Sequence, residues 1–171
     1  MEPAQSRSSS AVAFDPARKL LYVLDCWNHR IKLFTGEGKY VRQWGREGSG
    51  AGEFRLPQSQ ALDEDGRVYA GDSDSGRVQV FDEHGTFIRQ LVSFPSTSPG
   101  QGFNALAVAP RHKGGGVCFA DTAKCRVVVL TEDGSVVPIN DGSFQQPTRV
   151  AFDADGLLYV ADKHGLQVFV Y

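Results

Sequence analysis

The sequence predicts an all-β fold of propeller type, and three observations support this prediction. Residues 20–24 and 30–34 are two short apolar segments on either side of a polar turn, and their period-2 patterning with Tyr, Val, Ile and Phe favours strands over a helix. The pattern returns at residues 69–81, 118–130 and 159–169. In the first three copies an Asp precedes an Arg by five residues, and successive repeat Asp residues lie 47, 49 and 41 positions apart. This period is typical of propeller blades.

Each repeat consists of four short segments, a to d, and the chain contains three complete units and a partial fourth. We expect the units at about residues 11–59, 60–104, 105–148 and 149–171, after a polar, Ser-rich, disordered segment at 1–10. Segments a, rich in small residues, lie at 11–14, 60–62, 105–109 and 149–152 and are predicted at the crowded axis. Segments d lie at 40–44, 86–92 and 135–139. Pro138 cannot donate to a ladder, which places segment d at the outer edge.

The turns and connectors keep the same register from unit to unit. Residues 63–66 (DEDG) and 153–156 (DADG) are typical hairpin turns between segments a and b. Gly-rich connectors at 45–57, 95–104 and 140–147 join segment d to the next segment a. Each connector carries a Phe located 18 residues before the next repeat Asp, namely Phe54, Phe103 and Phe144.

Composition and charge are ordinary for a globular domain, with 41% hydrophobic residues, 22% charged residues and a formal net charge of −2. The three cysteines contain no CxxC pair, which favours a reducing compartment, so we expect a cytoplasmic or nuclear location. The N-terminal residues lack the apolar region of a signal peptide, and no apolar run approaches the roughly 20 residues of a membrane helix. We therefore expect no association with a membrane.

The first repeat contains Asn28-His29 followed by Arg30-Ile31, with YVLD before it and GKYVRQWGREGSGAGEFRLP after it. This resembles the NHL-repeat family of β-propellers over about residues 11–171. The second and third units replace Asn-His by Ser-Gly and Lys-Cys, and the fourth has Leu166 where Arg is expected. Members of the family usually close a ring of six blades. With about four blades, we expect an incomplete or open propeller, or a four-bladed ring, and predict self-association through open blade edges.

The recurring acidic and basic residues are interpreted as structural. An Asp that ends segment b can accept backbone N–H bonds of the following turn, and an Arg that opens segment c can pair with it. A catalytic group would not recur once per blade, whereas a device that stacks repeats would. The structural set is Asp25, Arg30, Asp72, Arg77, Asp121, Arg126 and Asp162.

No catalytic group, metal site or cofactor site is predicted. The four histidines are dispersed, and no pair of them has the spacing of metal ligands. The Gly-rich residues 48–52 lack the Lys-Ser/Thr of a phosphate-binding loop. The DEDG and DADG turns lack the Glu that a calcium loop requires at its twelfth position.

Because the strands alternate in direction, the b–c turns and the d–a connectors are expected on one face of the molecule. Eight basic and eight acidic residues fall on that face, whereas the a–b and c–d turns carry an excess of acids. Neither face is basic, so we do not expect nucleic acid as a partner. The candidate binding residues on the neutral face are Trp27, Asn28, His29, Arg46, Arg55, Lys124 and His164. Trp27 is either a contact for a partner or a lid over the blade edge.

These observations favour a non-catalytic module that binds a protein partner. The resemblance implies substrate recognition for a RING or tripartite-motif ubiquitin ligase, without the RING itself, and hence a role in ubiquitin-dependent turnover. RNA binding is the first alternative that the family implies, and face charge argues against it. A propeller enzyme of lyase or lactonase type, with a metal at the central channel, is the second. It ranks last because segments a offer no His or carboxylate.

Overall fold

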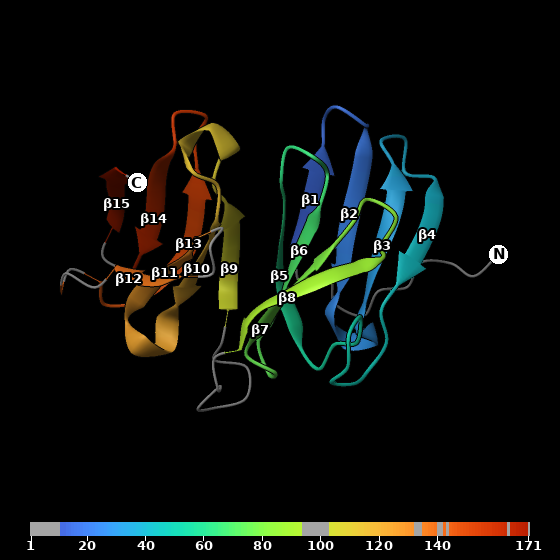
Figure 1. The fold of residues 1–171 in the computed structure, drawn as a ribbon, viewed down its shortest axis with the longest axis horizontal. Helices are drawn as coiled ribbons and strands as arrows, with labels where there is room; N and C mark the ends of the chain where they lie inside the picture. Colours follow the sequence, from blue (N-terminus) through green and yellow to red (C-terminus); the bar gives the residue numbers. More distant parts are fainter. Residues whose placement is uncertain are drawn as a thin grey trace.

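The computed structural model describes residues 11–93, 103–131, 135–139, 142, 144–163 and 165–170, and the fold below is that of these residues. They form four antiparallel sheets with almost no helix, which confirms the all-β propeller fold with about four blades (Figure 1). Three single turns of 3-10 helix lie between successive strands, namely η1 (Cys26–Asn28), η2 (Arg111–Lys113) and η3 (Thr122–Lys124). The predicted disordered segment at 1–10 lies outside the described residues.

In every blade the strands follow chain order, so neighbours in sequence are neighbours in the sheet. Blade 1 contains β1 (Ala11–Asp15), β2 (Leu20–Asp25), β3 (Arg30–Thr35) and β4 (Tyr40–Trp44). Blade 2 contains β5 (Pro57–Leu62), β6 (Val68–Asp72), β7 (Arg77–Phe81) and β8 (Phe87–Ser93). Blade 3 contains β9 (Phe103–Val108), β10 (Val117–Asp121), β11 (Arg126–Leu130) and β12 (Val136–Ile139). Blade 4 contains β13 (Pro147–Phe152), β14 (Leu157–Asp162) and β15 (Gly165–Val170).

The register places each repeat Asp opposite the residue that opens the next strand. Asp25 pairs with Arg30 across β2 and β3, and the equivalent Asp and Arg residues pair in blades 2 and 3. In blade 4 the turn is shorter, and Asp162 pairs with Gly165. The sequence spacing of five residues is therefore the span of one b–c hairpin turn.

The first strands of the blades form the inside of the molecule. Strand β5 contacts both β1 and β9, and β9 contacts β13. The fourth strands, β4, β8 and β12, each end their sheet. Pro138 lies in β12, an end strand of its sheet, where a residue without a backbone N–H is tolerated. Figure 1 shows the sheets arranged side by side, with β4 at one end of the molecule and β15 at the other, and each sheet remains open.

The hydrophobic core is divided into layers between adjacent blades. The layer between blades 1 and 2 contains Tyr22, Leu24, Ile31, Leu33, Phe54, Val68, Ala70 and Phe81. In β11, Val128 and Leu130 face blade 2, whereas Val127 and Val129 face blade 4. Since successive side chains of a strand point to opposite faces, a strand between two blades must be apolar on both. This explains the continuous apolar run of β11.

Three inner strands begin earlier than predicted. β5 starts at Pro57 rather than at residue 60, β9 starts at Phe103 rather than at residue 105, and β13 starts at Pro147 rather than at residue 149. A register shift after each proline lets Pro57 pair with Asp72 and Pro147 pair with Asp162. Proline is tolerated as the first residue of a strand, so the connector continues directly into the sheet. The division of the chain into the predicted units stays a prediction.

Among the described residues, no helix has the length and apolar character needed to cross a membrane.

Candidate functional site

The candidate site is the face that carries the turns between second and third strands and the connectors between blades, called here the loop face. In Figure 1, η1 and η3 lie at the same lower edge of the molecule, and η2 lies at the upper edge. Both η1 and η3 follow a repeat Asp directly, and each ends on a residue in the left-handed conformation, His29 at φ 53° and Cys125 at φ 50°. The sequence thus gives the b–c turn the same compact shape in blades 1 and 3.

Asp25 is fully buried at the base of the first loop and is neutralised within its own blade. Lys32 Nζ lies 2.8 Å from its carboxylate and Arg30 Nε lies 3.3 Å away. Asn28 Nδ2 donates a hydrogen bond of 2.8 Å to the same group. Burial by itself raises the pKa of Asp25, but the hydrogen bonds and charges of Lys32, Asn28 and Arg30 together lower it below its ordinary value. The carboxylate therefore stays ionised and fixes the turn that carries Trp27.

Asp72 is equally buried but holds the connector between blades 1 and 2. The backbone N–H groups of Arg55 and Leu56 donate to its carboxylate at 3.0 and 2.7 Å. Ser75 Oγ donates to it from the b–c turn, and Arg77 Nε lies 3.7 Å away. One carboxylate thus joins the turn of blade 2 to the chain that arrives from blade 1.

Two further residues of blade 2 secure the same connector. Arg77 donates to the backbone carbonyls of Ser49 at 2.5 Å and Glu53 at 2.7 Å. Gln79 is fully buried, donates to the Glu53 carbonyl at 2.7 Å and accepts from the Gly52 N–H at 2.9 Å. The sequence reasoning missed Gln79, because a Gln inside an apolar strand was not treated as a signal of a fixed loop.

The repeat Asp residues of blades 3 and 4 follow the same two schemes. Asp121 accepts from the Lys124 N–H at 3.3 Å and pairs with Arg126 at 2.9 Å, close to the arrangement in blade 1. Asp162 accepts from the N–H groups of Gln145 and Gln146 at 3.0 and 2.9 Å, as Asp72 does in blade 2. These contacts support the structural role assigned to the repeat residues, which stays a prediction.

Of the candidate binding residues in the first loop, Trp27 presents the largest apolar surface. Its exposed fraction is 65%, although it lies between the buried Cys26 and the capped end of η1. Asn28 is exposed but uses its amide on Asp25, and His29 is half-buried. Gly45, at φ +97°, packs against this loop, where a Cβ would lie 2.8 Å from the His29 carbonyl oxygen. The first loop and the first connector are therefore in direct contact.

The remaining candidates are distributed over the loop face. Arg46 is exposed and pairs with Glu53 at 2.8 Å. Arg55 lines a pocket of about 370 Å³ together with Glu47, Gly48, Ser49 and Asp74. Lys124 is exposed on η3 in blade 3. His164 lies outside the described residues.

At the axis, the four first strands line a second pocket of about 220 Å³. Its polar residues are Gln58, Ser59, Gln60 and Arg149. Gln60 links blades 1 and 2, because its amide donates to the carbonyls of Ala11 and Tyr22 at 3.2 and 2.9 Å. Within the described part of the chain, no three His, Cys, Asp or Glu side chains come together to hold a metal ion. These residues do not fit the channel metal that the resemblance implies for enzymes, and we derive no metal-dependent step.

Comparison with known proteins agrees with this fold. A family described as "6-bladed beta-propeller" matches residues 12–89, and the NHL repeat matches residues 144–171. A solved nidogen/laminin complex superposes with a TM-score of 0.75 at 19% identity over 95% of this chain and 59% of that chain. Virginiamycin B lyase from Staphylococcus aureus gives a TM-score of 0.69 at 10% identity, over 98% and 57% of the two chains. The chain has a β-propeller fold, and its residues 144–171 match the NHL repeat.

Two groups of curated proteins are similar in sequence. Peptidyl-glycine alpha-amidating monooxygenase B of Xenopus laevis is 29% identical over 94% of this chain, and the Rattus norvegicus enzyme is 29% identical over 90%. The chain spans 20% and 17% of their lengths. Protein lin-41 of Caenorhabditis elegans is 44% identical over 28% of this chain. The expected likeness to tripartite-motif proteins rests on this match with lin-41 and is weakly supported, because the match covers only a short segment.

These relatives contradict the expectation that the chain is not an enzyme. Alignments that cover 90% or more of the chain, at 29% identity, are with an amidating enzyme. The expectation rested on two criteria. The four inner segments contain no His or carboxylate, and the Asp and Arg residues recur once per blade, which was interpreted as structural. Binding and catalytic propellers share one scaffold, so neither criterion separates them.

Proposed function

We propose that this propeller binds peptide or protein segments on its loop face. Propellers of the NHL type support protein interaction in general, and the relatives that align along most of the chain are named for a peptidyl-glycine substrate. The observation that carries the proposal is an exposed tryptophan on a loop whose base is fixed by a buried ion pair.

Trp27 is suited to be the main contact. Tryptophan offers a large apolar surface with one N–H donor, and it is enriched among residues that dominate interface energies. The adjacent Asp25 is held by Lys32 and Arg30, so the loop is fixed before a partner arrives. Less conformational entropy is then lost on binding than for a mobile loop.

The neighbouring connector offers a polar subsite. Arg55, Glu47 and Asp74 line the same pocket of about 370 Å³, so the pocket carries both signs of charge. A peptide backbone presents donors and acceptors together and suits such a mixed lining. A polyanion such as RNA would meet the two carboxylates, and RNA binding is accordingly disfavoured.

Substrate recognition in ubiquitin-dependent turnover is a narrower hypothesis, supported by the short match with lin-41. Co-precipitation of ubiquitinated partners with the wild-type chain, and their loss with Trp27→Ala, would support it. A cytoplasmic or nuclear location also stays a proposal, motivated by three free cysteines. Self-association through open blade edges is a further prediction, which sedimentation velocity checks.

The test of the main proposal is selection of binders from a random peptide library displayed on phage. Peptides selected on the wild-type chain should bind Trp27→Ala about 30-fold more weakly, the factor that corresponds to a loss of about 2 kcal/mol at an interface hot spot. Tyr40→Ala is the matched control, since Tyr40 is an exposed aromatic residue, at 51%, in β4. Equal binding by Trp27→Ala and the wild type, with both variants folded by thermal melting, would overturn the proposal.

A further inference from the structure

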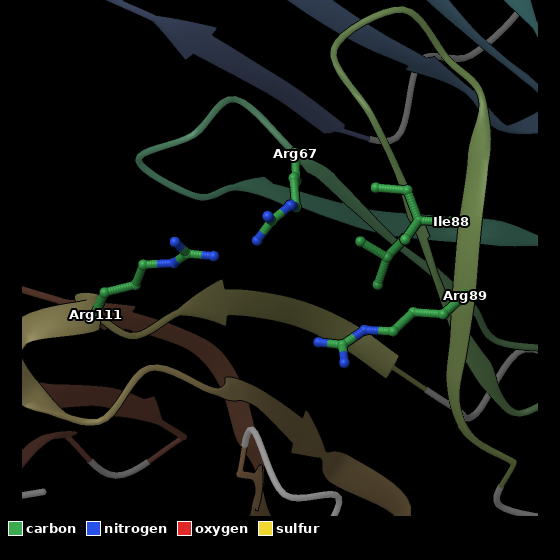
Figure 2. Close-up of a pocket in the computed structure, with 5 residues that line it drawn as sticks. Arg67, Ile88, Arg89 and Arg111 are labelled. Carbon is green, nitrogen blue, oxygen red and sulfur yellow. The ribbon is translucent and has the colours of Figure 1, made fainter.

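The face opposite the loop face carries a pocket of about 370 Å³ between blades 2 and 3, lined by Arg67, Val80, Ile88, Arg89 and Arg111. The three arginines come from separate parts of the chain. Arg67 precedes β6, Arg89 belongs to β8, and Arg111 lies in η2 of blade 3. Figure 2 shows their guanidinium groups extending from three sides toward the same space.

The positive charge of this pocket is only partly neutralised. Asp65 is shared between two arginines, 2.8 Å from Arg111 and 3.4 Å from Arg67. Asp63 lies 3.6 Å from Arg67, but its side chain is 3% exposed and accepts from two backbone N–H groups and the Tyr69 hydroxyl. The Arg89 side chain has no ion-pair or hydrogen-bond partner within the described residues. The pocket thus contains three guanidinium groups, and two of them share two carboxylates, one of which is buried.

Converging like charges are unfavourable unless an anion lies between them. The planar guanidinium group binds the two oxygens of a carboxylate or phosphate in parallel, so three such groups define a site for one oxyanion. We propose that this pocket binds an acidic side chain, a carboxylate or a phosphate, carried by an extended peptide segment.

The pocket's surroundings favour a peptide over a free polyanion. Arg89 and Ile88 lie on β8, which ends its sheet, so its outer backbone groups remain available to an added strand. Ile88 is 46% exposed and, with Val80, gives the pocket an apolar side for a neighbouring residue of the peptide. Beyond the pocket the same face carries Asp82, which would repel a chain of phosphates, and Glu83, which is paired with Arg18 at 2.7 Å.

This inference is independent of the proposed function, because the pocket lies on the opposite face and shares no residue with the loop-face site. Acids outnumber bases along the sequence of the turns on this face, and the pocket results from the approach of a β8 residue to the turns of two blades.

The test uses fluorescein-labelled nonapeptide libraries, random except for a fixed central residue that is Glu, phosphoserine or Lys. Fluorescence anisotropy with the full chain should detect binding of the Glu or the phosphoserine library and not of the Lys library. Arg89→Gln and Arg111→Gln should each weaken that binding about tenfold or more, because a charge-assisted hydrogen bond is lost. Lys39→Gln, an exposed charge on the same face in blade 1, should leave it unchanged.

The two acidic libraries identify the source of the oxyanion: preference for phosphoserine assigns a phosphorylated segment, and equal binding assigns a carboxylate. Equal binding of the acidic and Lys libraries overturns the proposal, as does equal weakening by Lys39→Gln. Binding of inorganic phosphate without either peptide library identifies an adventitious ion only and also overturns it. Tighter binding of a labelled uridine oligonucleotide, lost with Arg89→Gln, would replace the peptide with RNA.

Discussion

Blades 1 and 2 place the same residue at the same position and use it differently. Asp25 and Asp72 both end a second strand, both pair with an Arg across the hairpin, and both are fully buried. Asp25 forms ion pairs with side chains of its own blade, with Lys32 at 2.8 Å. Asp72 accepts hydrogen bonds from backbone N–H groups of the connector from the previous blade. One residue stabilises a blade internally and the other joins two blades.

The difference shows that the repeat fixes the location of a buried carboxylate and leaves its partners to the neighbouring loops. A buried carboxylate must be paired or hydrogen-bonded wherever it stands. In blade 1 the partner is a lysine inside β3, and in blade 2 the same strand position is occupied by Gln79, which binds the connector instead. The repeat Asp therefore occupies the same position in both blades, but its contribution to the free energy of unfolding differs between them.

The largest effect is expected for Asp25→Ala. This change leaves Lys32, with a side chain 7% exposed, as a charge without its 2.8 Å partner. Breaking a buried ion pair by removing one partner costs about 3–5 kcal/mol. Urea unfolding of the wild type and the variant measures this difference in the free energy of unfolding.

The control for this prediction is the double variant Asp25→Asn with Lys32→Met, which removes both charges. It should recover more than half of the loss, because Lys32 is then no longer a buried charge without its partner. If the double variant were no more stable than Asp25→Ala, the ion pair would not be the source of the effect.

A smaller loss, about 1–3 kcal/mol, is expected for Asp72→Ala, which leaves the N–H groups of Arg55 and Leu56 without their acceptor. Because the connector is released, hydrogen exchange at these two amides should rise more than exchange at β2 in the same variant. Uniform faster exchange throughout both blades would show that Asp72 does not act locally. Unchanged stability together with loss of selected peptide binding would make its role functional.

Acidification should reduce stability through Asp25. Its pKa is lowered in the folded chain, with burial opposing and Lys32, Asn28 and Arg30 outweighing it. The stabilisation is therefore complete above the unfolded value of about 3.9 and is lost as the pH falls through the lower folded value. The difference in unfolding free energy between wild type and the double variant should shrink from about pH 5 to pH 2.5. A constant difference would contradict the assigned direction.

The smallest effect, below about 1 kcal/mol, is expected for Asp121→Ala, since Asp121 and Arg126 have side chains 14% and 22% exposed. Water can solvate the Arg126 guanidinium after the change. Thermal melting in low and high salt measures it. A loss as large as that of Asp72→Ala would show that exposure does not control the contribution of the repeat Asp.

The sequence predicted much of the fold correctly because the repeat is local. The period-2 pattern placed β4 at residues 40–44, and Pro138 placed β12 at a sheet edge. The offset of 18 residues between Phe54 and Asp72, which recurs in the other connectors, has a structural explanation. Phe54 is fully buried beside blade 2, and Asp72 accepts hydrogen bonds from the N–H groups of the next two residues, Arg55 and Leu56. The starts of β5 and β13 were misplaced because a proline at a connector suggested a turn rather than a strand.

The candidate site was less predictable. Trp27 and Arg55 could be assigned to one face from the alternation of strand direction, but the anchoring of the connector by Arg77 and Gln79 depends on contacts 24 to 28 residues apart. The non-enzyme expectation failed because the chemistry of a propeller is not encoded in the composition of its inner strands.

The sequence by itself determined the strand order, the blade period and the place of each repeat carboxylate, because these follow from hydrophobic alternation and turn residues close together in the chain. The tertiary structure alone decided which partners those carboxylates have and which charges meet across blades. Arg67, Arg89 and Arg111 are separated by about twenty residues at each step and belong to different strands and turns. Their approach depends on how blade 2 packs against blade 3, and the core layer between these blades sets it.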